Sequence, residues 1–151
     1  MDNQEIEQII GDVIERFLKP KFRELGMPAS GEWEENVEAR GNEIWGRHYA
    51  EYLVEGRPPN KDQDPEAMRR WVGWAGSTFL KYWVQNKGLN ISPYAVAWKI
   101  AREGTDWYPN GSDLLEVLES KEVLDYINDS IRPLVVRDVQ LAFNRYVKEL
   151  V

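Results

Sequence analysis

Cysteine is absent from the 151 residues of this chain, and histidine occurs once, at position 48. Without cysteine there can be no disulfide and no thiolate ligand for a metal ion. The absence fits a protein made in a reducing cytoplasm. A chain of this length can bury the core of one domain without covalent cross-links, so we expect a single domain over 1–151.

Long apolar runs and clustered positive charge are also missing. No apolar run approaches the roughly 20 residues that span a bilayer, and the acidic start MDNQEIEQII lacks the features of a secretion signal, so we expect a soluble protein. The net charge is −7, and Arg69-Arg70 is the only adjacent basic pair. General nucleic-acid binders cluster their cations to neutralise phosphates, so we expect any DNA to pass this protein without being gripped.

Aromatic residues, in contrast, are abundant, with seven tryptophans and seven tyrosines. They suit a dense core or an extensive subunit interface. The most organised segment, 77–107, places aromatic and aliphatic residues at helical spacing and contains no recognisable nucleophile, metal cluster or phosphate loop. We therefore expect a structural or interaction protein, and we expect the helices of 77–104 to supply most of the core.

The first predicted helix covers residues 2–25. Its apolar residues recur at three- and four-residue spacing and form one stripe: Ile6, Ile9, Ile10, Val13, Ile14, Phe17 and Leu18. Asp2 and Glu5 have the spacing of a capping box, and Gly26 is a natural stop. Pro20 is expected to kink the last turn or to end the helix early.

A small β-element is predicted over 32–54. Apolar and polar residues alternate from Trp33 to Arg40, Gly41-Asn42 favours a tight turn, and the segment after it is rich in β-favouring residues. The end of that segment, 49–54, also fits a helical turn.

The rest of the chain is predicted to be helical. Helical spacing covers 65–87, interrupted near Gly73 and Gly76-Ser77, and a further helix runs from Ser92-Pro93 to Gly104. A C-terminal helical region covers 112–150, which Pro133 should break or bend. The fold class is therefore α+β: a small antiparallel hairpin flanked by an N-terminal amphipathic helix and several C-terminal helices.

No residues of the chain are predicted to be catalytic, cofactor-binding or metal-ligating. The lone His48 would need an orienting partner and a nucleophile to act as a general base, so a packed or surface histidine is the better interpretation. The spacing of Asp62, Asp64 and Glu66 is similar to a calcium loop, but the glycine and closing glutamate of that pattern do not follow. These acids favour a helix start instead. We expect neither enzymatic activity nor a cofactor.

Two proline-containing loops, 56–59 and 107–111, combine stiffness with side chains that suit partner contacts. The alternative is that both are simply rigid turns. With the tyrosines that precede the first loop, the candidate contacts to a partner or a second subunit are Arg57, Pro58, Pro59, Trp107, Tyr108, Tyr49 and Tyr52.

The order of several motifs resembles the tail-completion, or head–tail joining, proteins of tailed bacteriophages. The matching motifs are HYAEYLVEGRPP at 48–59, WVQNKG at 83–88, an A-x-x-I-x-x-x-G-T helix from Ala97 to Thr105, and DWYPNGSDLLE at 106–116. The resemblance covers about residues 1–120. The segment MRRWVGWAGS at 68–77 departs from it, and residues 120–151 are less diagnostic.

This resemblance implies a non-enzymatic virion protein made in the host bacterial cytoplasm. Its members form a ring at the neck, so a hexamer or dodecamer is expected, between portal or adaptor proteins and the tail tube or terminator proteins. DNA passes through the channel without specific binding. The alternatives are another connector component, such as an adaptor or stopper, and a small helical interaction module of a bacterial cell. A hydrolase that depends on His48 is the weakest hypothesis.

Overall fold

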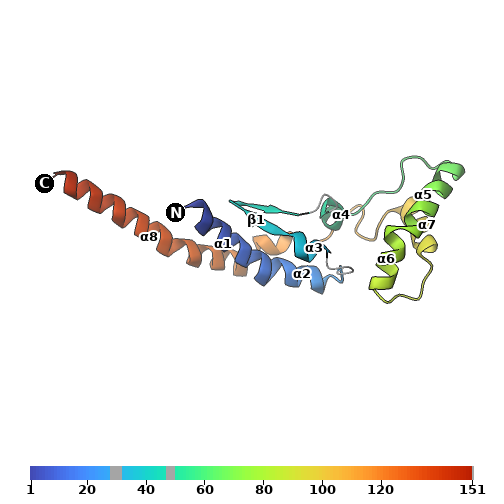
Figure 1. Cartoon of the computed structure of the whole chain (residues 1–151), viewed down its shortest axis with the longest axis horizontal. Coiled ribbons are helices and arrows are strands. Elements are labelled where there is room, and N and C mark those ends of the chain that lie inside the picture. Colours follow the sequence, from blue (N-terminus) through green and yellow to red (C-terminus); the bar gives the residue numbers. More distant parts are fainter. Residues whose placement is uncertain (28–31, 47–49, 151) are drawn as a thin grey trace.

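The computed structural model describes residues 1–27, 32–46 and 50–150 and is elongated (Figure 1). At one end of the long axis lies a helical lobe made of α5 (Pro65–Ser77), α6 (Phe79–Asn86) and α7 (Pro93–Glu103). The other elements form what we call the body: α1 (Asn3–Val13), η1 (Ile14–Leu18), α2 (Lys19–Glu24), α3 (Glu32–Asn36), β1 (Glu38–Arg40), β2 (Glu43–Trp45), α4 (Ala50–Glu55), η2 (Glu116–Glu119) and α8 (Lys121–Leu150).

The structure is therefore mostly helical, with one two-stranded antiparallel sheet and a helix at the N-terminus, which agrees in outline with the predicted class. The lobe is an insertion, because the chain leaves the body after α4 and returns to it before η2 (Figure 1). None of the helices in the described ranges has both the length and the apolar character needed to cross a membrane.

The N-terminal helix begins as predicted and passes through Pro20. The side chain of Asp2 accepts the Glu5 backbone N–H at 2.8 Å, and the Glu5 side chain accepts the Asp2 N–H at 3.0 Å, which completes the capping box. Pro20 does not end the helix early. A wide π-helical segment, η1, directly precedes it, at the turn where a proline ring would crowd the preceding carbonyl groups. Gly26, with φ +68°, follows the last turn.

The core of the body joins this helix to segments far along the chain. Its buried residues are Ile14, Leu18, Phe22, Met27, Trp33, Val37 and Leu114. The predicted strand from Trp33 to Arg40 is wrong in its first half, because Glu32–Asn36 form α3 and the strand β1 begins only at Glu38. Trp33 and Val37 are both buried, one helical turn apart, and Trp33 stacks on Phe22 with ring centroids 4.3 Å apart. Burial of that pair outweighs the alternating pattern.

The predicted hairpin is real but short. β1 and β2 pair antiparallel around Gly41-Asn42, with Ala39 opposite Ile44, and Gly41 has a positive φ of 59°. The returning strand does not reach residue 54, because residues 50–55 form α4 instead. This matches the helical alternative for the end of the segment. His48 and Tyr49 lie outside the described residues.

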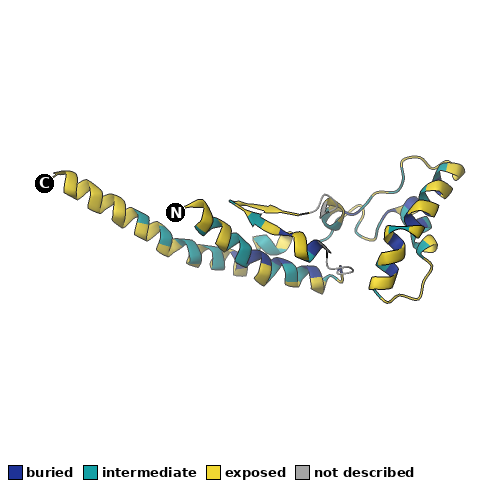
Figure 2. Ribbon diagram, viewed as in Figure 1, coloured by how far each residue is buried: buried dark blue, intermediate teal, exposed yellow. Residues whose placement is uncertain are grey.

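The lobe has its own buried cluster, made of Met68, Val72, Ala75, Leu80, Ala97 and Ala101. The interruption after Gly76-Ser77 separates α5 from α6 at Thr78, and α7 begins at Pro93 as predicted. The expectation that 77–104 supplies most of the core is wrong. Residues 77–104 supply only half of the lobe cluster, and all the buried residues of the body cluster lie outside 77–104. Figure 2 shows buried residues in both the lobe and the body.

The last helix, α8, runs unbroken for 30 residues with Pro133 inside it. Its first half packs along α1, where the Tyr126 hydroxyl donates to Asp12 at 2.9 Å. Near the start of α1, Arg137 makes a two-pronged ion pair with Glu5 at 2.5 and 3.0 Å, and the Met1 amine pairs with Asp138. Of the two effects predicted for Pro133, the break is wrong and the bend stays a prediction. The contacts with α1 on both sides of Pro133 explain why the helix continues.

The ion pair between Glu5 and Arg137 predicts a specific dependence of stability on pH. Hydrogen bonds from Arg137, and then from the Asp2 backbone, lower the pKa of Glu5 from 4.5 to about 2. A carboxyl group whose pKa is lowered by folding stabilises the fold at pH values above its pKa in the unfolded chain. This stabilisation is lost as the pH falls toward the pKa of the group in the folded protein. We therefore expect Glu5→Gln to be less stable than the parent chain at neutral pH.

The difference between Glu5→Gln and the parent should shrink as pH falls from about 4.5 to about 2. Urea denaturation followed by circular dichroism measures both proteins across this range. Glu35→Gln, an exposed acid in α3, serves as the control and should keep the parent's pH dependence. A pH-independent difference between Glu5→Gln and the parent would contradict the assignment.

Candidate assembly surfaces

The two proline-containing loops that the sequence singles out lie against each other, and together they join the lobe to the body. We call residues 56–63 and 104–111 the connector. The Thr105 N–H donates to the Arg57 carbonyl at 2.9 Å, and the Arg57 N–H donates to the Thr105 hydroxyl at 2.8 Å. On the body side, Ser112 donates from its N–H to Val54 and from its hydroxyl to Leu53, each at 2.6 Å.

Arg57 is used within the chain. Its guanidinium donates to the Asn60 side chain at 2.9 Å and to the Pro58 carbonyl at 3.0 Å, and it lies 4.4 Å from the centroid of the Trp71 ring. Partial burial in this position lowers the pKa of Arg57. The side chain therefore ties the connector to α5 of the lobe.

Trp107 also faces inward, because it packs against the core cluster of the body. Pro59 is half-buried, while Pro58, Tyr52 and Tyr108 are exposed, the two tyrosines by 48% and 40%. Tyr49 lies outside the described residues. The structure thus brings the two predicted loops together, and both Arg57 and Trp107 make contacts within the chain, with α5 and with the core of the body. Their contact with a partner stays a prediction.

A more extensive apolar surface lies on the C-terminal half of α8. Eight large apolar side chains there are 41–68% exposed, and all of them except Leu141 share one side of the helix. We call these seven the C-terminal face: Val135, Val136, Val139, Phe143, Tyr146, Val147 and Leu150. Because α1 begins opposite Asp138, the last 12 residues of α8 extend about 18 Å beyond it (Figure 2).

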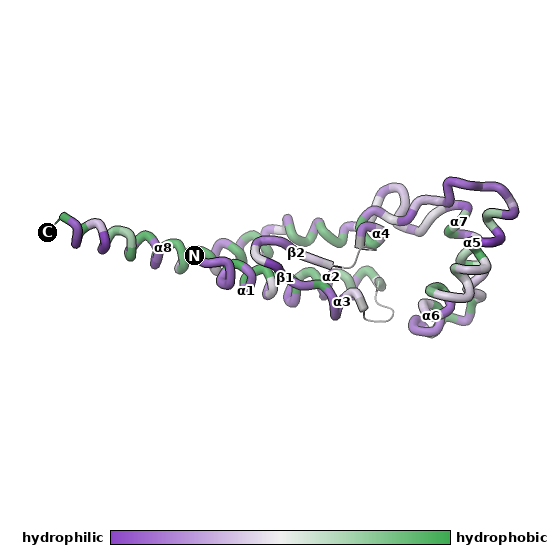
Figure 3. Tube along the Cα trace, turned by 45° about the horizontal axis from the view of Figure 1, so that its top comes forward, coloured by the Kyte–Doolittle hydropathy of each residue, from purple (hydrophilic) through white to green (hydrophobic). Residues whose placement is uncertain are grey.

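The C-terminal face points away from the side of α8 that packs on α1. At about 100° per residue, Val123, Ile127 and Leu134 share one side of the helix, and the C-terminal face covers roughly 120° of the other side. The residues of α8 before position 135 on that other side are mainly polar: Asp125, Asn128, Asp129 and Arg132. The helix thus carries two apolar stripes on opposite sides, one in each half, with Leu141 as the exception. Figure 3 shows that hydrophobic residues recur along the whole length of α8.

A second exposed apolar surface lies on the lobe. Trp74 of α5 and Phe79 and Tyr82 of α6 are 58%, 45% and 60% exposed, and the first two rings meet edge to face with centroids 5.5 Å apart. We call these three residues the aromatic surface. Arg70, one helical turn before Trp74, and Lys81, next to Tyr82, are exposed on the same two helices.

Charge is divided unequally between the two ends of the molecule. Residues 56–111, the lobe and connector, carry eight Lys or Arg against five Asp or Glu. The remainder of the chain carries eleven against twenty-one. The lobe is therefore cationic and the body strongly anionic, although the chain as a whole is acidic.

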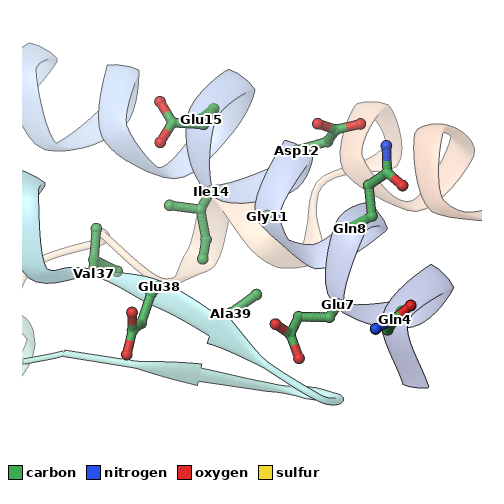
Figure 4. Close-up of a pocket in the computed structure, with 10 residues that line it drawn as sticks. All are labelled: Gln4, Glu7, Gln8, Gly11, Asp12, Ile14, Glu15, Val37, Glu38 and Ala39. Carbon is green, nitrogen blue, oxygen red and sulfur yellow. The ribbon is translucent and has the colours of Figure 1, made fainter.

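An open groove of about 500 Å³ lies in the body between α1 and β1 (Figure 4). Its carboxylates are engaged within the chain: Glu7 accepts the Gly41 N–H at 2.8 Å, Asp12 accepts the Tyr126 hydroxyl, and Glu15 pairs with Lys19. Nowhere in residues 1–27, 32–46 and 50–150 do three His, Cys, Asp or Glu side chains come close enough together to hold a metal ion. The groove therefore carries no assigned chemistry.

No protein-family model, no curated protein and no solved structure matches this chain. The surfaces just described are therefore the structural basis for a proposal about function. The prediction of one helical region over 112–150 does not distinguish the C-terminal face from the rest of that region. The pattern that reveals it is the change of side near residue 135.

Proposed function

We propose that this protein is a structural subunit of the neck of a tailed bacteriophage, where several copies form a ring at the head–tail junction. The observation that carries the proposal is the pair of exposed apolar surfaces at opposite ends of the molecule, the C-terminal face and the aromatic surface. Exposed patches of this kind mark sites of association with other proteins. The motif order described above supplies the place of assembly.

The charge of the body supports the proposed passage of DNA. The body has ten more acidic than basic residues, and such a surface repels phosphates. A channel lined by the body would let DNA slide through without being held. Portal or adaptor proteins on one side and tail-tube or terminator proteins on the other are the proposed neighbours.

Two alternatives make different predictions about location. An adaptor or stopper is also a ring component of the neck, and it would differ only in its immediate neighbours. A small bacterial interaction module would be found in uninfected cells and would have no place in a virion.

Gold-labelled antibodies against the lobe, applied to negatively stained virions of the source phage, test the proposal. We expect label at the junction between head and tail, and we expect the chain among the proteins of purified particles by mass spectrometry. An antibody against the major capsid protein serves as the control for labelling. Absence of the chain from purified particles, or label confined to the capsid or the tail tip, would refute the proposed function.

A further inference from the structure

We propose that the C-terminal halves of α8 from neighbouring copies pack side by side and in parallel, through their C-terminal faces. The occupant of the C-terminal face is thus the same face of a second copy. The inference deepens the proposed function, and its parallel orientation rests on that function. Subunits of a ring are related by rotation about one axis, so corresponding helices of neighbouring copies point the same way.

The end of α8 lacks the packing that normally stabilises a helix. Every residue from Val139 to Leu150 is exposed, so the described part of the chain covers little of this segment (Figure 2). Isolated helices shorter than about 12–15 residues are marginal in water, and most helical stability in proteins comes from packing of an apolar side. A partner that covers the C-terminal face would therefore stabilise the helix itself.

The spacing of the apolar residues indicates that this partner is another helix. Five side chains of the C-terminal face follow one another at alternating intervals of three and four residues. We call these five the seam: Val136, Val139, Phe143, Tyr146 and Leu150. This is the a/d pattern of a coiled coil, in which each side chain fits between four residues of a facing helix. Asp129 and Arg132 occupy the two preceding positions of the pattern, so the seam begins at Val136.

A second copy supplies a helix with the matching seam. When two copies of α8 lie parallel and in register, each seam residue meets its own counterpart, so every layer of the contact is apolar. On either side of the seam, Val135 then faces Gln140 of the second copy, and Ala142 faces Val147. No like charges meet at these flanking positions.

The charged residues in this half of α8 lie outside the contact. Five of them occur between 135 and 150, and each lies roughly 40° or more beyond the edge of the C-terminal face: Arg137, Asp138, Arg145, Lys148 and Glu149. The first two are already paired, Arg137 with Glu5 and Asp138 with the Met1 amine. The apolar pattern therefore selects the partner, and charge at the contact does not oppose it.

The contact is large enough to be stable. From the exposed fractions of its seven side chains, we estimate that the C-terminal face presents on the order of 700 Å² of surface. A standard protein interface buries roughly 800 Å² on each partner. The width of the face, roughly 120°, also exceeds the narrow stripe of two residues in seven that a two-stranded coiled coil buries. Each α8 thus has room for a neighbour on both sides of the seam, as a ring requires.

Because the chain has no cysteine, single cysteines test this contact directly. A disulfide forms only when the two Cα atoms lie within about 7 Å. Parallel packing brings Tyr146→Cys against the same residue of the next copy. In a glutathione redox buffer, we expect this variant to run mainly as a disulfide-linked dimer on a non-reducing gel. Tyr146 is 59% exposed, so the variant should fold, and circular dichroism checks this.

Leu141→Cys is the matched control. Leu141 is 58% exposed but lies on the side of α8 opposite the C-terminal face. In the proposed pair, its two copies are separated by more than the 8–10 Å between packed helix axes. We therefore expect Leu141→Cys to stay monomeric on the same gel. Equal crosslinking of Leu141→Cys and Tyr146→Cys would show random collision and would overturn the proposal.

Mixtures of cysteine variants test the orientation and the occupant. An antiparallel pair would bring Phe143 of one copy against Tyr146 of the other. Preferential crosslinking between Phe143→Cys and Tyr146→Cys, identified by intact mass, would therefore overturn the parallel arrangement. Preferential crosslinking of Tyr146→Cys to Tyr82→Cys would assign the C-terminal face to the lobe of a second copy and would also overturn the proposal.

Light scattering after size exclusion tests the association without oxidation. We expect the parent chain to be oligomeric and Phe143→Glu to be monomeric, because Phe143 lies in the middle of the seam. A parent chain that stays monomeric at millimolar concentration overturns the proposal. If Tyr146→Cys crosslinks but the chain is absent from virions, the contact stands and the neck function fails. If label is found at the neck but Tyr146→Cys does not crosslink, the function stands and this contact fails.

Discussion

Replacing Gly56 by alanine is expected to destabilise the chain by about 3–5 kcal/mol, an effect well above that of an ordinary point mutation. Gly56 has φ +81°, a conformation that costs an L-residue roughly 1–2 kcal/mol. An added Cβ would also lie within 2.6 Å of the Trp107 carbonyl carbon and 2.8 Å from the Tyr108 Cα. Both are backbone atoms, so the two segments of the connector would have to separate.

Gly88→Ala isolates the effect of this close approach. Gly88 has a similar positive φ of 64°, but an added Cβ there meets no atom within 4 Å. Gly88→Ala should therefore lose only the stability that the positive φ costs an alanine, about 1–2 kcal/mol. Urea denaturation measures the free energy of unfolding of both variants. Equal losses of stability would show that the two segments of the connector can move apart without a cost.

Hydrogen exchange locates the damage. In Gly56→Ala, the amides of Thr105 and Ser112 should exchange faster, because they donate across the connector to Arg57 and Val54. Protection of Ala97 and Ala101, in the core of the lobe, should change less. This pattern would show that the lobe and the body depend on the connector for their attachment more than for their own folding.

Local patterns in the sequence predicted the local structure well. The capping box of Asp2 and Glu5, the turn at Gly41-Asn42, the division between α5 and α6, and the start of α7 at Pro93 are all confirmed. Each of these features depends on residues within one or two turns of each other, so the physical cause is contained in a short segment.

Features that depend on distant residues were not predictable in the same way. The segment from Trp33 to Val37 has an alternating pattern, but stacking of Trp33 on Phe22 favours a helix there. The two loops of the connector are separated by almost fifty residues, and nothing in either one indicates that its partner is the other. The expectation that 77–104 supplies most of the core is wrong for the same reason, because Leu114 and the N-terminal helix are far apart in the sequence and build the body core together.

The C-terminal face is different, because the sequence contains the information needed to find it. Most apolar positions of α8 change sides between Leu134 and Val135, with Leu141 as the exception, and a single amphipathic helix that packs on one neighbour does not do this. Within the described residues, α8 packs on α1 and η2, and the C-terminal face stays exposed.

The second large effect is expected for Leu114→Ala, which should destabilise the body by about 2–5 kcal/mol. Leu114 is 1% exposed and lies in the core cluster with Ile14, Leu18 and Phe22, although it follows them by nearly a hundred residues. Removing its side chain leaves a cavity at the point where the chain returns from the lobe. The adjacent Leu115 is 44% exposed, so Leu115→Ala should cost less than about 1 kcal/mol.

The pair of leucines also tests whether the two cores unfold separately. Every buried residue of the lobe cluster lies between Met68 and Ala101, so the chain after the connector contributes none of them. We expect Leu114→Ala to speed hydrogen exchange at Ile14 and Leu18 while Val72 and Ala97 keep their protection. Equal loss in both clusters would show that the connector couples them into one cooperative unit, and equal effects of the two leucine variants would contradict the place of Leu114 in the core.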